Sequence, residues 1–227
     1  MPVAQPVVPV ISLPHAVLFP HALLSIQVNQ KTMGERFGVT AGEWFAEGAI
    51  WGLAMSRGDA RKRRPLDEPV PTYRTLGIGC IVHRECQGGI MRRLVFEGIV
   101  RGRIIDSCEI PAQVYTSTLR VELLHDCVNT EGPRRKELTR AYSDLVKVAR
   151  KVATAEPNLR DRIRGILASH PHPGIVADLL ANSCLRDSYA KQCILEELNV
   201  LRRVQLVRIQ MAQMIACHMP HHTHTRR

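Results

Sequence analysis

The pattern of hydrophobic and polar residues changes near the middle of the chain. Up to residue 131, apolar residues fall in short runs or alternate with polar residues, which is typical of β-strands. Turn-forming glycine, proline and polar residues separate these runs. Six to eight short strands predict a small, closed or nearly closed β-barrel. The predicted strands are 7–13, 22–28, 49–55, 75–86, 91–99, 101–106, 112–115 and 118–125.

One helix and two connections interrupt these strands. Residues 30–47 are compatible with a helix that Asn29 caps and Gly48 follows. Residues 56–74 predict a charged, proline-rich loop, and residues 87–89 predict a hairpin turn.

After Gly132-Pro133 the hydrophobic period changes from 2 to 3.6, which predicts helices. Asn158, Asp187 and Asn199 are the expected N-caps of three of them. The fold class is therefore α+β, with a β-barrel subdomain over 1–131, a helical bundle over 132–217 and a disordered His-rich tail over 218–227. The first predicted helix has an apolar stripe over 138–152, and the later helices cover 158–167, 175–184, 188–198 and 200–217.

Charge is distributed unevenly between the two halves. The chain of 227 residues has a net charge of +10. Most of this charge lies in residues 132–227, which have 17 basic and 8 acidic side chains. Such a basic half is either a solvated helix surface or a surface for nucleic acid or an acidic partner. Aromatic residues make up only 4%, which argues against recognition by base stacking.

The cysteines and apolar runs predict the compartment. Seven cysteines are widely spaced and never form a Cys-x-x-Cys pair, which favours reduced thiols over disulfides or a zinc site. Prolines interrupt the uncharged first 30 residues, and no later run has the roughly 18–20 apolar residues that span a bilayer. We expect a cytoplasmic protein that has no membrane-spanning segment and binds no metal or cofactor.

Motifs for common catalytic classes are missing from the sequence. There is no Gly-Lys dipeptide, so a P-loop is excluded, and HExxH, GxSxG and GxGxxG are absent too. A Ser–Lys dyad stays open on composition alone, but no lysine has a recognisable catalytic context. We expect a protein that is not an enzyme.

Three groups of residues are candidates for binding. Two of these groups also have an interpretation without a binding role: the basic run 61–64 as a solvated loop, and the histidines of the tail as a loose terminus. Trp44, Phe45 and Trp51 lie within eight residues in a chain that is poor in aromatics. They are expected either to pack in the core or to anchor a partner peptide at the edge between strands and helices.

Three ordered segments resemble the N-terminal, substrate-binding domain of Lon protease. Residues 11–14 and 17–20 read ISLP and VLFP, and residues 94–104 read LVFEGIVRGRI. Residues 173–181 read PGIVADLLA, followed by Lys191-Gln192, the run LEELNV over 195–200, and Arg203. The resemblance implies a PUA-like β-barrel followed by a helical bundle. The chain departs from the family pattern after the second strand and at Gly102, and it stops where Lon would continue into ATPase and protease domains, as a stand-alone member would.

Several of these motif residues are expected to be architectural. Phe96 should point into the barrel, Gly98 and Gly102 should permit a tight bend or a close approach of strands, and the arginines should lie at the surface. The architectural set is Phe19, Pro20, Phe96, Gly98, Arg101 and Arg103.

The function that the resemblance implies is a non-catalytic module for protein quality control. It would bind unfolded or partly folded protein segments, with a Lon-type protease as a further candidate partner. The alternative is a PUA-like protein that binds RNA or DNA through the basic helical half.

Overall fold

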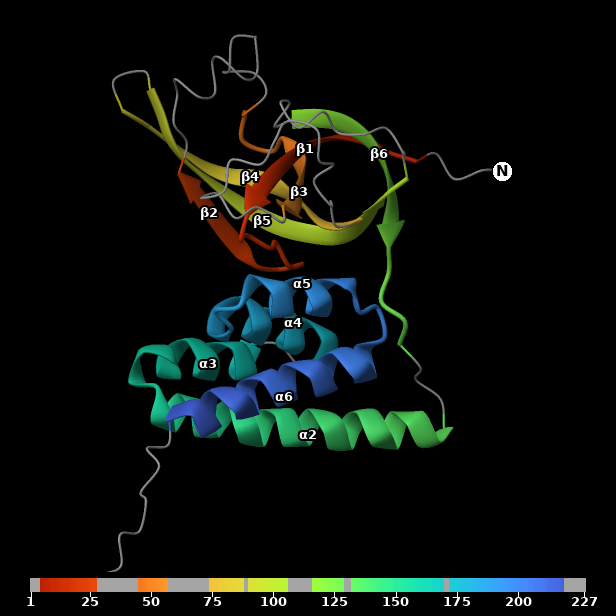
Figure 1. Ribbon diagram of the computed structural model, residues 1–227, viewed down its shortest axis with the longest axis vertical. Coiled ribbons are helices and arrows are strands. Elements are labelled where there is room, and N and C mark those ends of the chain that lie inside the picture. Colours follow the sequence, from red (N-terminus) through yellow and green to blue (C-terminus); the bar gives the residue numbers. More distant parts are fainter. Residues whose placement is uncertain are drawn as a thin grey trace, which may run out of the picture. The chain divides into compact units, whose positions relative to one another are not determined.

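The computed structural model describes residues 5–27, 45–56, 74–87, 90–105, 116–128, 132–169 and 172–218. The chain divides into two compact units (Figure 1). The sheet unit comprises residues 1–125 together with 191–196, and the helical unit comprises residues 126–190 and 197–227.

The first half of the chain forms strands where the alternating pattern predicts them. The predicted strands 91–99 and 101–106 are one continuous strand, because the pairing with the preceding strand runs on through Val100 and Arg101. Residues 30–44 of the predicted helix 30–47 lie outside the described residues, and residues 45–47 are not helical. The turn at 88–89 and the strand 112–115 also lie outside the described residues. The strands are β1 (Val7–Pro14), β2 (Leu23–Gln27), β3 (Ile50–Ser56), β4 (Thr75–Gln87), β5 (Ile90–Ile104) and β6 (Thr116–Leu124).

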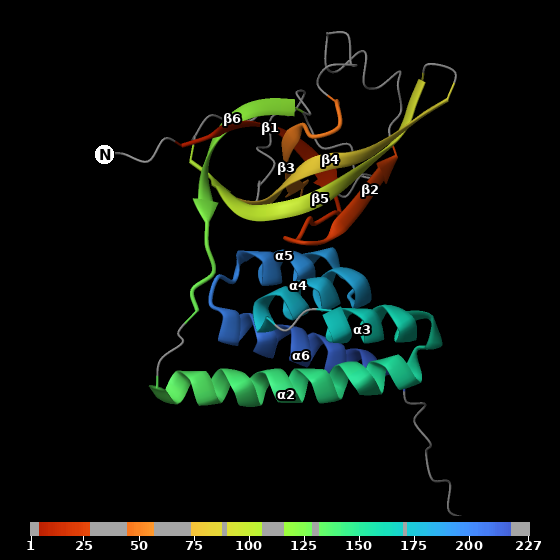
Figure 2. The same cartoon turned by 180° about the vertical axis from the view of Figure 1, so that it is seen from behind.

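The six strands form one mixed sheet in the order β2-β5-β4-β3-β1-β6. Only β1 and β3 are parallel, and the other neighbours are antiparallel. Strand β5 also pairs with β6, Arg101 lying opposite Leu124, so the pairings of five strands form a closed circuit to which β2 is added. Figure 2 shows the long curve of β5 that meets these neighbours along its length.

Inward-facing residues of the strands fill the sheet unit. One cluster gathers Leu18, Phe45, Trp51 and Phe96 with other apolar side chains, and a second gathers Val10, Leu76 and Val121 with their neighbours. Burial of large side chains contributes roughly 1.5–3 kcal/mol each, so these clusters account for much of the stability of this unit.

The second half of the chain is helical, as the 3.6-residue period predicts. The first helix begins at Gly132, with Pro133 in its first turn, where a missing amide donor costs nothing. Helices α2 and α6 lie side by side in Figures 1 and 2. The helices are α2 (Gly132–Ala155), α3 (Pro157–Ser169), α4 (Pro173–Cys184), α5 (Ser188–Glu196) and α6 (Val200–His218).

Two of the three expected caps are confirmed. The Asp187 carboxylate accepts a hydrogen bond from the amide of Tyr189 at 2.9 Å, and the Asn199 side chain accepts one from the amide of Arg202 at 3.1 Å. Asn158 is not a cap, because α3 begins one residue earlier, at Pro157. The strands of the first half and the helices of the second half confirm the α+β class.

No described helix is long and apolar enough to cross a membrane. The His-rich tail after residue 218 lies outside the described residues.

Candidate functional site

Two of the three aromatic residues that were expected either to pack in the core or to anchor a partner, Phe45 and Trp51, lie in the core of the sheet unit. Phe45 and Trp51 are 0% and 1% exposed, and their rings stack with centroids 4.9 Å apart. The inward position of Trp51 on β3 explains this burial, since alternate residues of a strand face the same side. Phe45 and Trp51 therefore offer no surface for a partner, and Trp44 lies outside the described residues.

The motif residues Phe19, Pro20 and Gly98 bring the connection after β1 onto β5. The amide of His21 donates to the carbonyl of Gly98 at 2.8 Å, and the amide of Gly98 donates to the carbonyl of Ala22 at 2.9 Å. A Cβ atom on Gly98 would overlap the carbonyl of Phe19, so this approach needs glycine. Phe19, Pro20 and the inward-facing Phe96 are buried around it.

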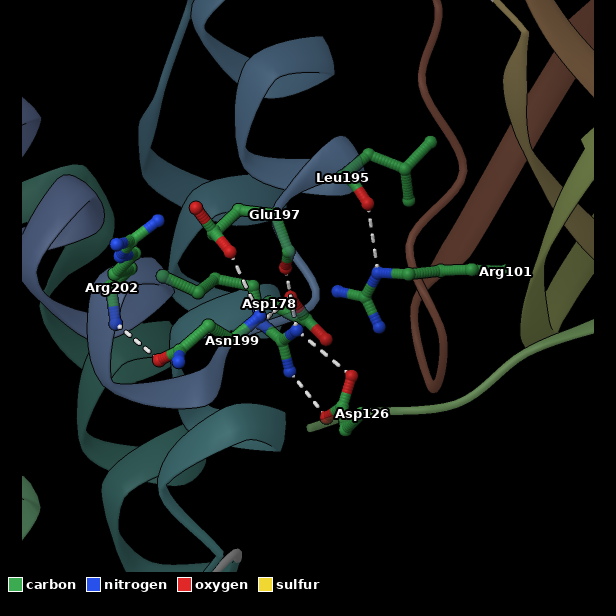
Figure 3. Close-up of polar contacts among 8 residues, drawn as sticks. Arg101, Asp126, Asp178, Leu195, Glu197, Asn199 and Arg202 are labelled. Carbon is green, nitrogen blue, oxygen red and sulfur yellow. Dashed lines mark hydrogen bonds and ion pairs between the residues drawn. The ribbon is translucent and has the colours of Figure 1, made fainter. Parts of the chain in front are cut away.

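The two motif arginines of β5 have different environments. Arg103 is exposed and pairs with Glu122 at 3.4 Å, as the alternation predicts. Arg101 corrects the prediction of surface arginines, because it is only 3% exposed and its Nε donates to the carbonyl of Leu195 at 3.0 Å (Figure 3). An arginine at the C-terminal end of a helix satisfies carbonyls that lack helical partners. Arg101 thereby holds the end of α5 within the sheet unit.

Gln192, from the Lys-Gln motif, has a similar structural role. Its buried side-chain amide donates to the carbonyl of Thr75 at 2.9 Å and to the carboxylate of Glu196 at 3.0 Å. Together with Arg101, it explains why residues 191–196 group with the sheet unit.

The motif arginine of α6 forms a buried ion network in the helical unit. Arg203 is 0% exposed, and its guanidinium makes a bidentate contact with Asp126 and an ion pair with Asp178 at 3.1 Å (Figure 3). It also donates to the carbonyl of Glu197 at 2.9 Å. Gly174 lies so close that a Cβ atom there would stand 2.7 Å from a guanidinium nitrogen.

The carboxylates keep this buried arginine charged. Burial by itself lowers the pKa of Arg203, but the hydrogen bond to Asp126 and the charges of Asp178, Asp126 and Glu197 outweigh it and raise the pKa above its ordinary value. The network joins the segment before α2, helix α4 and helix α6. The motifs that carry the family resemblance thus stabilise each unit from within, and they do not form a binding surface.

The helical unit contains a groove with an apolar floor, which we take as the candidate site. It has a volume of about 390 Å³ and lies where the start of α3, the α4–α5 connection and the later turns of α6 meet. The apolar lining is Leu159, Cys184, Leu185, Ala190 and Met214, and the polar lining is Glu156, Asn158, Ser183, Arg186, Asp187, Gln210 and Gln213.

The groove has the form of a ligand-binding site. Cys184 and Leu185 form a buried floor, and Leu159 and Met214 are half-buried walls. Clefts of about 300–1,000 Å³ that combine an apolar lining with a few polar groups are the usual form of ligand sites. Among the described residues, no group of three metal-ligating side chains comes together anywhere.

No local pattern in the sequence indicates this groove. Its walls come from α3, α4, α5 and α6, and the half-buried Leu159 and Met214 look like ordinary members of helical stripes. Only the arrangement of the helices brings them to one cleft.

Comparisons with known proteins agree with the resemblance seen in the sequence. No protein-family profile matches the chain. Lon protease of Syntrophus aciditrophicus (strain SB) is 23% identical over 202 residues, and Lon protease 2 of Myxococcus xanthus is 26% identical over 203 residues. Each alignment covers 88% of this chain, and the chain spans about a quarter of the length of these relatives.

Solved structures show the same fold. The N-terminal domain of Mycobacterium avium complex Lon protease has a TM-score of 0.59 at 15% identity and matches 91% of this chain and 98% of that domain. A Lon N-terminal domain protein from Xanthomonas campestris has a TM-score of 0.50, also at 15% identity, over 95% and 99% of the two chains. The fold is that of Lon N-terminal domains, and the predicted resemblance is confirmed.

Proposed function

We propose that this chain is a non-catalytic module that binds exposed apolar segments of unfolded or damaged proteins. The observation that carries the proposal is the apolar-floored groove of the helical unit in a fold shared with Lon N-terminal domains. In this account apolar side chains of the client occupy the cleft between Leu159 and Met214.

The expected affinity is weak and broad. Burying one apolar side chain contributes roughly 1.5–3 kcal/mol, and association and ordering consume part of that gain. One or two side chains in the groove therefore give an affinity on the order of tens of micromolar or weaker, unless further contacts add to it. The flexible thioether side chain of Met214 suits clients of different shape.

The similarity to Lon proteases supports a role beside proteolysis. A Lon-type protease is a candidate partner, with protein quality control in the cytoplasm as the setting. The described thiols of Cys80, Cys86, Cys127, Cys184 and Cys193 suit a reducing compartment.

The test compares two states of one client. The full chain is titrated into a fluorescently labelled, reduced and carboxymethylated protein that cannot fold, and into the same protein in its native, disulfide-bonded state. Fluorescence anisotropy should rise for the unfolded form alone. Equal binding of both forms, or no binding at concentrations on the order of hundreds of micromolar, contradicts the proposal.

A further inference from the structure

A second pocket of the helical unit is basic. It has a volume of about 430 Å³ and lies between the last turns of α2 and the helix α3. Arg150 of α2 and Arg160 and Arg164 of α3 line it together with Ile163 and Leu167, and the lining is completed by Ala153, Thr154 and Ala168. Three cationic groups thus surround an apolar floor.

The geometry directs the arginines to one place. Arg160 and Arg164 are four residues apart, so they lie on the same face of α3. The Nε of Arg160 donates to the carbonyl of Ala153 at 3.3 Å, which fixes the base of its guanidinium and satisfies a carbonyl in the last turn of α2.

No carboxylate is among the residues that line the pocket. Nearby acidic residues are Asp144, which pairs with Lys147 at 3.0 Å, Glu156, which lines the apolar groove, and Asp161, an exposed residue that follows Arg160 on α3. The charged groups of the lining itself are all cationic, which favours an anionic ligand, and guanidinium groups bind carboxylates through paired hydrogen bonds.

We propose that this pocket binds the aspartate or glutamate side chains that flank an apolar segment of a client. The inference rests on the proposed function and adds a sequence preference to it. Helix α3 links the two sites, because Leu159 lines the apolar groove and the next residue, Arg160, lines the basic pocket. A client with an acidic residue close to an apolar residue can reach both.

The lining favours a peptide over a nucleic acid. No aromatic side chain lines the pocket, so there is no platform on which a base can stack. The floor of Ile163 and Leu167 suits the methylene groups of acidic side chains or a neighbouring apolar residue. A phosphate backbone would follow an extended basic stripe rather than one compact pocket.

The experiment compares two labelled peptides on the full chain. One has a leucine- and phenylalanine-rich centre flanked by aspartates, and the other has asparagines in their place. In low salt the aspartate peptide should bind about three- to tenfold more tightly, because the charge pairs are partly exposed. Added salt should reduce this preference by screening.

Two variants locate the effect. Arg150→Gln with Arg164→Gln should abolish the preference for aspartate and leave the affinity for the asparagine peptide unchanged. Arg134→Gln with Arg135→Gln removes the same charge from exposed positions at the start of α2 and should retain the preference. Circular dichroism of each variant verifies that it is folded.

Each remaining outcome is decisive. Equal affinities of the two peptides for the wild-type chain, or equal losses in both double variants, overturn the acidic preference while binding of the asparagine peptide still supports the proposed function. If neither peptide binds, the proposed function fails as well. A single-stranded oligonucleotide that binds more tightly than the aspartate peptide, and loses affinity in the Arg150→Gln, Arg164→Gln variant, assigns the pocket to nucleic acid instead.

Discussion

Replacing Arg203 with methionine should destabilise the helical unit severely. The substitution keeps an unbranched side chain of similar length in α6 but removes the charge between Asp126 and Asp178. The two carboxylates then differ in their access to water. The Asp126 side chain is 27% exposed and can be rehydrated, whereas the Asp178 side chain is 3% exposed and cannot.

The magnitude follows from the stranded charge. Removing one partner of a buried ion pair typically costs about 3–5 kcal/mol, because the other charge stays buried without compensation. We expect a loss in this range, mostly from Asp178. A second change, Asp178→Asn, should recover part of the loss, since a neutral amide costs less to bury than a carboxylate.

Urea unfolding followed by two signals measures the effect. Far-ultraviolet circular dichroism reports the helices, and the fluorescence of the buried Trp51 reports the sheet unit. The matched control is Arg202→Met, one residue away on the same helix and exposed. It should change the free energy of unfolding by less than about 0.5 kcal/mol.

The reasoning is refuted if Arg203→Met costs no more than Arg202→Met. If Arg203→Met does not fold at all, Arg203→Lys supplies the measurement. Lysine keeps the charge but loses the bidentate contact with Asp126, so an intermediate loss is expected.

Three further predictions concern packing and ionisation. In Gly165→Ala the new methyl group in α3 meets open space, so the protein should become more stable by about 0.5–1 kcal/mol in urea unfolding. In Gly98→Ala the methyl group overlaps the Phe19 carbonyl, so the protein should become less stable by about 1–3 kcal/mol. A change of the same sign in both variants would contradict this reasoning. Phe96→Ala should lower the free energy of unfolding by about 3–5 kcal/mol. A loss no larger than that of a substitution at an exposed position would show that the ring is not in the core. Burial raises the pKa of Tyr142 above its ordinary value of 10.0. The neutral phenol therefore stabilises the fold below pH 10, and this stability is lost as the pH rises through the raised pKa. Unfolding measured as a function of pH should show this loss in the wild type and not in Tyr142→Phe.

The sequence predicts the class and order of elements well because the hydrophobic period is local. The change of period at Gly132-Pro133 coincides with the start of α2, and the caps at Asp187 and Asn199 can be recognised from residue type alone. The division of β5 into two strands at Val100 was wrong, because the pairing with β4 continues through Val100 and Arg101. Gly98 and Gly102 permit close approach within this one continuous strand.

The sites were less predictable because they depend on long-range contacts. Nothing local distinguishes the buried Arg101 from the exposed Arg103, since the difference arises from the carbonyl of Leu195, far along the chain. The scarcity of aromatics made Phe45 and Trp51 candidates for a partner anchor, but these large apolar side chains are buried in the core. The groove beside Met214 combines four helices and has no signature in any one of them.

The most direct test of the account is the affinity of a groove variant for the unfolded client. Met214→Glu places a charge in the wall of the groove, and Ala212→Glu places the same charge at an exposed position of α6 that does not line it. By fluorescence anisotropy with the carboxymethylated client, Met214→Glu should weaken binding about tenfold or more, and Ala212→Glu should bind like the wild type. Equal affinity of the two folded variants would contradict the claim that this groove binds unfolded protein segments.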